Sequence, residues 1–115
     1  MKDFRDLSVW HKAHLLVVEV YRATEEFPGS ERYGLTSQIR RAASSVPANL
    51  AEGNGRAGKD RLYHFRIAYG SAKEVEVHLR LLVGAGVVDR SPTGEALELF
   101  DRVRAMTWRL LNPRP

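Results

Sequence analysis

The sequence predicts an all-α protein, an antiparallel up-down-up-down four-helix bundle with a proline-kinked second helix. Three observations lead to this fold class. Four segments place apolar residues three and four positions apart, which is the spacing of an amphipathic helix. Short segments rich in proline, glycine and serine separate them, as is typical of antiparallel bundles. No internal repeat, low-complexity linker or strand pattern competes with this arrangement.

Length and composition limit the class of protein. The 115 residues are expected to form one domain, residues 1–115, that removes about two-thirds of its unfolded surface from water. The chain has no cysteine, which excludes disulfides and thiolate metal sites and suits a reducing compartment. Its N-terminus lacks the apolar core of a signal peptide, and the longest uncharged run, residues 42–51, is too short to cross a bilayer. We therefore expect a soluble, cytoplasmic protein without a membrane partner.

The first helix is expected from about Ser8 to Glu26. Asp6 or Ser8 can cap its N-terminus, and Pro28 and Gly29 form the turn that ends it. Its apolar seam follows the three-four spacing of a bundle and consists of Trp10, Ala13, Val17, Val20, Thr24 and Phe27.

The second helix, from a Ser30 cap to about Asn54, carries Pro47 in its interior. A proline there removes a backbone donor and costs about 3 kcal/mol unless the fold uses the bend. We therefore predict a kink, with a break in the hydrogen-bond ladder near Ala43 and with Asn49 linking the bend to a neighbouring chain. Opposite the apolar face of this helix lies a row of small residues. We therefore expect other helices to pack against it on two sides. The apolar face consists of Leu35, Ile39, Ala42, Ala43, Val46 and Leu50, and the small face of Ser37, Ser44, Ala48 and Ala51.

The third helix, from about Lys59 to Gly86, has two apolar faces when its residues are placed about 100° apart. A bundle core covers only one of them, so we interpret the second as a subunit interface; a helix central within its own domain is the alternative. Glu74 falls within the second face and is expected to pair with an arginine or a backbone N–H across that interface. The first face consists of Leu62, Phe65, Ala68, Tyr69, Ala72, Val75, Leu79, Leu82 and Val83. The second consists of Tyr63, Ile67, Gly70, Val77 and Leu81.

The last helix starts at the SPTG segment, with Ser91 as its cap and Pro92 in the first helical position. The NPRP segment ends it. Its inward stripe consists of Leu99, Phe100, Val103, Met106, Thr107 and Leu110.

Positive charge is concentrated around the junction of the second and third helices. The chain carries 18 basic and 14 acidic residues, a net charge of +4, and the excess lies between residues 40 and 66. Arginine dominates, which suits phosphate contacts, although a GC-rich genome would produce the same bias. The residues expected to contact phosphate are Arg40, Arg41, Arg56, Lys59 and Arg66. A further row, spaced by seven along the third helix and interpreted as a solvated rim, consists of Lys59, Arg66, Lys73 and Arg80.

The chemical motifs predict neither catalysis nor a cofactor. Gly53, Gly55 and Gly58 spell G-x-G-x-x-G, but the dinucleotide fingerprint requires a preceding strand and a βαβ unit. We interpret them as a helix stop followed by a glycine cap. Glu74 and His78 lie four positions apart without a second such pair, so a di-metal bundle is not expected. The protein is therefore expected not to be an enzyme, and to hold no metal.

Three strings of the chain are specific enough to identify relatives. They are DLSVWHKA (6–13), FPGSERYGLTSQIRRAASSVPANLAEGNGR (27–56) and FRIAYGSAKEVEVHL (65–79). These strings resemble the bacterial four-helix-bundle family of intervening-sequence proteins, encoded within inserts of large-subunit ribosomal RNA genes. The same superfamily includes the accessory variability determinant of diversity-generating retroelements. The family pattern falls on Trp10, Arg40, Arg41, Pro47, Asn49, Glu52, Gly53, Arg56, Gly70 and Glu74.

The resemblance implies a homopentameric ring of four-helix protomers. For the retroelement branch it also implies a basic surface that binds nucleic acid and a reverse transcriptase. Two function classes follow for this chain, which fits both a retroelement accessory and a stand-alone family member. One is a nucleic-acid-binding accessory module that contacts the phosphates of RNA or DNA, since the sequence shows neither a recognition helix nor an exposed aromatic platform. The other is a purely structural or protein-interaction oligomer, because the net charge is too small to require a polyanion.

Overall fold

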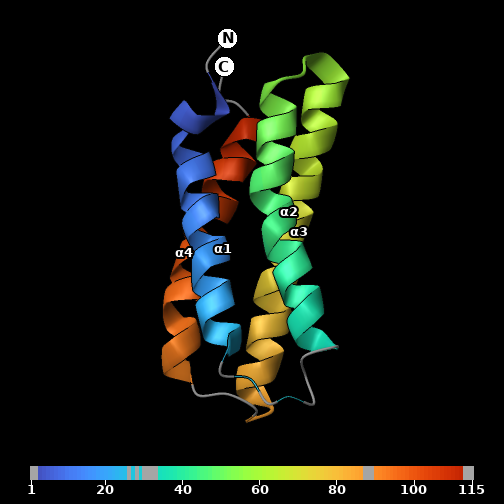
Figure 1. The fold of residues 1–115 in the computed structure, drawn as a ribbon. Coiled ribbons are helices and arrows are strands. Elements are labelled where there is room, and N and C mark those ends of the chain that lie inside the picture. The colour runs from blue at the N-terminus through green and yellow to red at the C-terminus, as the bar shows by residue number, and fades with distance from the viewer. Residues whose placement is uncertain (1–2, 26, 28, 30–33, 87–89, 113–115) are drawn as a thin grey trace.

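The regular structure of the chain is helical throughout the part that is described. The computed structural model describes residues 3–25, 27, 29, 34–86 and 90–112, with only the backbone described for residues 90–97 and 99. After a short 3-10 helix, η1 (Phe4–Asp6), four α-helices follow: α1 (Ser8–Glu25), α2 (Leu35–Asn54), α3 (Gly58–Gly84) and α4 (Arg90–Leu111). They lie side by side along the 44 Å length of the molecule (Figure 1). The prediction of an all-α, four-helix protein is confirmed.

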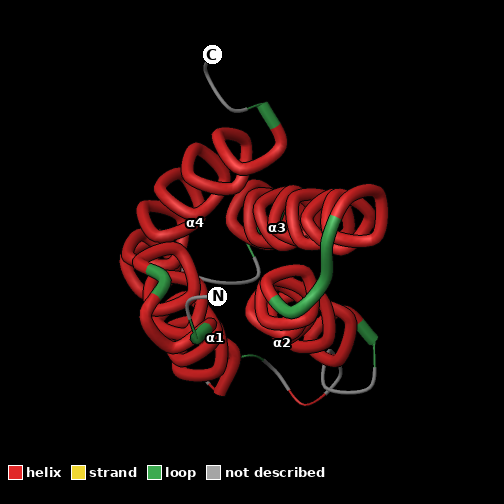
Figure 2. The backbone as a smooth tube through the Cα atoms, turned by 90° about the horizontal axis from the view of Figure 1, so that it is seen from above, coloured by secondary structure: helices red, strands yellow, loops and turns green. Residues whose placement is uncertain are grey.

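Each helix packs against two others around a common core. Contacts join α1 to α2, α2 to α3, α3 to α4 and α4 back to α1. Seen end-on, α1 and α3 occupy opposite corners of the bundle, as do α2 and α4 (Figure 2). A face of α3 that points away from the core is therefore far from α1.

The buried side chains follow the predicted stripes on α2 and α3 closely. On α2 they recur at helical spacing from Ile39 to Leu50, and on α3 from Phe65 to Leu82. In the first helical segment Ala13, Val20, Thr24 and Phe27 are buried as predicted, but Trp10 and Val17 are only half-buried, and their neighbours Val9 and Leu16 enter the core instead. The largest fully buried side chains are Phe100, Leu16, Ile39, Leu50, Leu79, Val20, Val46, Val75, Val103 and Thr107.

Helix α2 is continuous through Pro47, from Leu35 to Asn54. Two residues beyond the proline, the Asn49 amide donates to the Ser45 carbonyl and to Ser45 Oγ, both at 2.9 Å. Asn49 Oδ1 also lies 3.0 Å from His64 Nδ1 on α3. Asn49 therefore links the two helices of one protomer, where the sequence suggested a link to a neighbouring chain, and the kink itself stays a prediction.

Glycines lie at the junction between α2 and α3, although Gly53, predicted to help stop the helix, is a buried residue inside α2. The Gly55 N–H donates to carbonyls of the last turn of α2, and Gly58 starts α3 with a φ of +60°, in the left-handed region that favours glycine. The Arg61 side chain reaches back from α3 and donates to the carbonyls of Gly53, Asn54 and Arg56, at 2.9–3.2 Å. Arg61, one of the basic residues between positions 40 and 66, thus caps the C-terminus of α2.

The N-termini of the helices differ in part from the predicted caps. The Ser30 cap and the Pro28 turn lie outside the described residues, and Gly34 precedes α2. Helix α4 begins at Arg90, so Ser91 lies inside its first turn and is not the cap. At the N-terminus, Asp3 caps η1 by accepting from Arg5, and this hydrogen bonding lowers the pKa of the Asp3 carboxyl to about 2.

Substitution of Gly53 tests whether the stability of the protein depends on the close approach of α2 to α3. A Cβ at this position would lie 2.5 Å from Phe65 Cε1 and 2.7 Å from Cδ1. Because Phe65 is a buried ring with little room to move, we expect Gly53→Ala to lower the free energy of unfolding by about 1–3 kcal/mol. Gly84→Ala is the matched control, since nothing lies within 4 Å of its Cβ position, and its effect should be a gain of less than about 1 kcal/mol. Urea unfolding followed by circular dichroism measures both, and equal effects would contradict the close approach.

Candidate functional site

The five basic residues predicted to contact phosphate do not form one cluster within a protomer. Arg40 and Arg41 lie in the first half of α2, whereas Arg56 and Lys59 flank the junction at its far end. Arg56 follows Arg40 by sixteen positions, which corresponds to about 24 Å at the rise of an α-helix. In Figure 1 the two groups accordingly belong to the lower and upper parts of the bundle. A single phosphate-binding surface that uses all five residues would have to extend along the molecule.

Arg40 is half-buried and holds α2 against α1. Its Nε donates to Thr24 Oγ1 at 2.8 Å, and one terminal nitrogen donates to the Tyr21 carbonyl at 3.4 Å. The guanidinium also lies over the Tyr21 ring, 4.5 Å from its centroid, in a cation–π contact. These contacts give Arg40 a structural role between two helices.

The other four basic residues are exposed. Arg56 pairs with Glu52 at 3.5 Å across one helical turn, a solvent-exposed ion pair that contributes about 0–1 kcal/mol. Arg41 donates to Ser37 Oγ at 3.4 Å. Lys59 and Arg66 make no ion pair with any side chain in the described part of the chain. Arg41, Lys59 and Arg66 are therefore the predicted residues most available to an anionic partner.

Helix α3 exposes the second apolar face that its sequence predicted. We call this surface the outer face of α3, and define it by Tyr63, Ile67, Gly70, Glu74, Val77 and Leu81. The exposed fractions of Tyr63, Val77 and Leu81 are 59%, 54% and 58%, and Ile67 is half-buried. Within the protomer the Glu74 carboxylate lies 3.5 Å from His78 Nε2, four residues on. Three large apolar side chains on one exposed helix face form a surface suited to contact with another protein.

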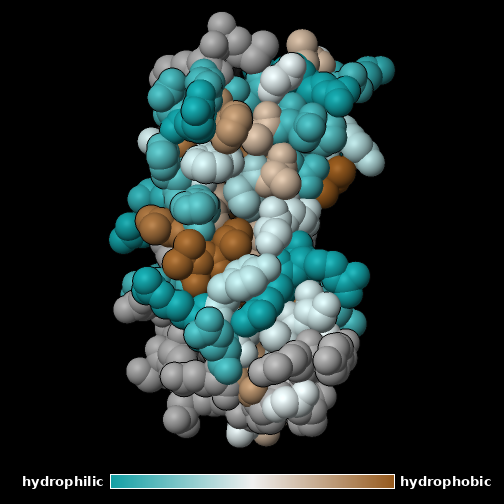
Figure 3. All heavy atoms as spheres, viewed as in Figure 1, coloured by the Kyte–Doolittle hydropathy of each residue, from teal (hydrophilic) through white to brown (hydrophobic). Residues whose placement is uncertain are grey.

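A second apolar patch lies on α1. On the side of the molecule drawn in Figure 3, apolar side chains gather over the middle of this helix, where Leu15 is half exposed. The two apolar surfaces belong to helices that occupy opposite corners of the bundle (Figure 2).

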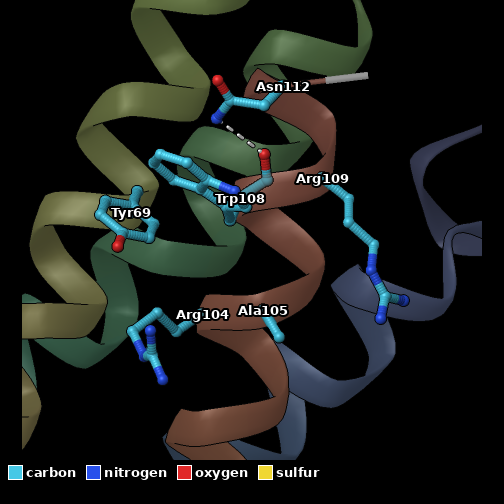
Figure 4. Close-up of a pocket in the computed structure, with 6 residues that line it drawn as sticks. All are labelled: Tyr69, Arg104, Ala105, Trp108, Arg109 and Asn112. Carbon is cyan, nitrogen blue, oxygen red and sulfur yellow. Dashed lines mark hydrogen bonds between the residues drawn. The ribbon is translucent and has the colours of Figure 1, made fainter. Parts of the chain in front are cut away.

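An aromatic groove lies between α3 and α4, and the sequence interpretation had missed it. Tyr69 and Trp108 lie together there, with ring centroids 5.9 Å apart (Figure 4). Trp108 is 53% exposed. The groove encloses about 660 Å³ and is lined by Tyr69, Arg104, Ala105, Trp108, Arg109 and Asn112. The expectation that the chain has no exposed aromatic platform was therefore wrong; the available signal was that Trp108 falls outside the apolar stripe of its helix.

The described residues were also compared with the requirements of a metal site and of a membrane-spanning helix. Among these residues, no three His, Asp or Glu side chains come together as a metal site would require. Likewise, none of the helices that the structure describes combines the length and apolarity needed to span a bilayer.

The comparisons with known proteins support the resemblance seen in the sequence. Residues 5–109 match the family of the 23S rRNA-intervening sequence protein. The chain belongs to this family. A solved structure of a protein of unknown function from the S23 ribosomal protein family, from Bacteroides thetaiotaomicron VPI-5482, superimposes with a TM-score of 0.80. It shares 19% sequence identity, over 90% of this chain and 94% of that one, and therefore supports the fold alone. No match was found among proteins with curated descriptions.

Several residues of the family pattern serve the packing of this protein. Trp10 is half-buried, with its ring stacked on His14 at 5.5 Å and edge-on to Phe4 at 5.1 Å. Gly53 allows α2 to approach α3, and Asn49 links the same two helices. By contrast, Gly70 lies on the outer face of α3 with nothing within 4 Å of its Cβ position. Part of the motif thus maintains the fold, whereas its exposed residues lie on α2, at the junction and on α3.

Substitutions of the adjacent residues Arg40 and Arg41 distinguish an arginine that stabilises the fold from one that is free to bind a partner. Because Arg40→Gln removes the guanidinium contacts to Thr24 and Tyr21, we expect it to lower the free energy of unfolding by about 1–2 kcal/mol. Arg41→Gln removes one long hydrogen bond at the surface and should change stability by no more than about 0.5 kcal/mol. Chemical denaturation of both variants makes the comparison, and equal stabilities would show that the Arg40 contacts do not hold α1 to α2.

Proposed function

We propose that this protein is a non-enzymatic homo-oligomer, a ring of five protomers that binds nucleic acid as an accessory module. The proposal includes an antiparallel up-down-up-down bundle whose second helix bends at Pro47. Short connections between successive helices and the course of the chain in Figure 1 support this topology. The observation that carries the function is the outer face of α3, where exposed apolar side chains lie beside an exposed row of basic ones.

The apolar part of this face favours contact with a second copy of the chain. Burying a large apolar side chain contributes about 1.5–3 kcal/mol, and Tyr63, Val77 and Leu81 leave more than half of their surface in water. If two outer faces met each other, the basic rows on both helices would approach. A head-to-tail contact, in which the outer face of α3 meets the patch around Leu15 on α1 of the next protomer, avoids this repulsion. Contacts of this kind close into rings when the rotation between copies permits.

Exposed basic residues on α2 and beside the outer face of α3 support binding to a polyanion. Arg41, Lys59 and Arg66 are exposed, and a ring repeats them in every protomer, which raises the local positive potential. Membership of a family named for an insert in ribosomal RNA favours RNA as the nucleic acid. A reverse transcriptase is the protein partner that we propose if the chain works within a retroelement.

A purely structural oligomer is the second candidate. It is favoured by the contacts of Arg40 with α1 and of Arg56 with Glu52, which engage two of the five predicted phosphate ligands inside the protomer. Both candidates require self-association, so the ring is tested first.

Charged substitutions on the two apolar patches test the head-to-tail contact. We expect Leu81→Asp and Leu15→Asp each to convert an assembly of about five 13.0 kDa chains into monomers, because each places a carboxylate in one half of every subunit contact. A mixture of the two variants should form dimers, since it retains one intact contact between unlike chains. Light scattering with size-exclusion chromatography measures all three masses. Helicity by circular dichroism should be unchanged, because both side chains are at least half exposed. A monomeric wild-type chain would contradict the proposal, and dimers of Leu15→Asp alone would contradict the head-to-tail geometry.

Salt dependence tests the nucleic-acid part. We expect the affinity for mixed-sequence RNA to fall with salt, by a log-log slope of about −0.7 per phosphate on single strands. The double variant Lys59→Gln, Arg66→Gln should bind more weakly and with a shallower slope, for all sequences alike. Arg102→Gln is the matched control, an exposed arginine on α4 outside the proposed surface. Fluorescence anisotropy at two salt concentrations measures both quantities, and an intact ring that binds no RNA at low salt would leave the structural oligomer as the function.

A further inference from the structure

In the groove between α3 and α4, Trp108 is exposed and Tyr69 is half-buried, so both leave aromatic surface outside the core. Trp108 leaves 53% of its surface in solvent. Its ring therefore contributes less to the stability of the protomer than a fully buried aromatic ring would. Tyr69 lies beside it at a tilt of 47°, so the two rings do not stack fully on each other. Figure 4 shows both rings on the same side of α4, with Arg104 below them. Ring surface is therefore available to a flat ligand.

Cations surround this pair. The Lys73 ammonium lies 5.3 Å from the centroid of the Tyr69 ring. Arg104 pairs only loosely with Asp101, at 3.9 Å, and 43% of its side chain is exposed. Among the described residues, no carboxylate lines the groove. Arg109 lines its other side and extends away from the rings (Figure 4). The groove thus combines aromatic surface with positive charge.

We propose that this groove binds an unpaired segment of RNA, with a base stacked on Trp108 and Tyr69 and the adjoining phosphates held by Lys73 and Arg104. Aromatic rings with nearby cations are the combination that binds single strands without reading their sequence. A duplex keeps its bases stacked on each other and cannot offer a base to Trp108. The groove volume of about 660 Å³ lies within the range of about 300–1,000 Å³ common for ligand sites. The inference rests on the proposed nucleic-acid binding and adds a base-stacking contact at the groove and a preference for single strands.

The groove and the outer face of α3 do not compete for the same surface. Tyr69 follows Tyr63 by six residues and precedes Leu81 by twelve, which places it about 120° around the helix from both. A protomer can therefore contact its neighbour through the outer face while the groove stays open. Lys73 lies between the two surfaces, four residues after Tyr69 on the same helix.

Trp108 itself supplies the readout. The chain has two tryptophans, so Trp10→Phe leaves Trp108 as the only one. We expect single-stranded oligouridylate to quench the emission of this variant, and an RNA duplex of the same length to quench it less. Trp108→Ala should weaken binding of the single strand by about tenfold or more, the usual effect of removing one stacked base contact. Trp108→Phe should retain most of the affinity, and Arg102→Gln should retain all of it.

The other possible results distinguish failure of the groove inference from failure of the proposed function. If anisotropy shows RNA binding while Trp108 emission stays constant and Trp108→Ala binds normally, the groove inference is overturned and the proposed function stands. If the intact ring binds neither single strand nor duplex at low salt, both fall. If Trp108 emission instead changes with protein concentration in the absence of RNA, the groove is a subunit contact and the inference is wrong.

Discussion

The close packing of α2 against α3 is the constraint on which the rest of the structure depends. Gly53 lets the helices approach to within contact of the Phe65 ring, and the Arg61 guanidinium closes the junction by binding carbonyls at the end of α2. Farther along, the polar contacts of Asn49 with His64 and of Ser71 with Ser45 join the same two helices. With α3 held in this way, one apolar face enters the core and the other is turned toward solvent.

This orientation links the fold to the proposed function. A helix fixed on one side by α2 and on the other by α4 has no rotational freedom to bury its outer face within the protomer. The apolar residues from Tyr63 to Leu81 must then remain in water or meet another chain. The same orientation carries the basic row of α3 between the outer face and the groove at Trp108. Self-association and RNA binding can thus use adjacent surfaces of a single helix.

Sequence reasoning succeeded where periodicity alone decides the outcome, and failed where tertiary packing does. The buried faces of α2 and α3 could be predicted because small or polar residues flank their apolar stripes. On α1, Trp10 and Leu16 both fit an apolar pattern, and only the structure shows that the large indole lies at the edge, against Phe4. The role of Arg40 depends on Thr24, sixteen residues earlier. Such long-range contacts have no periodic signal, and neither does the pairing of Tyr69 with Trp108 across two helices.

Directed cross-linking tests most directly whether the outward-facing surface of α3 meets another copy. Because the chain has no cysteine, cysteines introduced at Leu15 and Leu81 are the only sites for a short bismaleimide linker. The head-to-tail ring predicts that the double variant, Leu15→Cys with Leu81→Cys, gives a ladder of covalent species ending at five chains. Each single variant should remain uncross-linked, since like positions do not meet. A dimer from Leu81→Cys alone, or an uncross-linked double variant, would contradict the central claim that the outer face of α3 binds α1 of the next protomer.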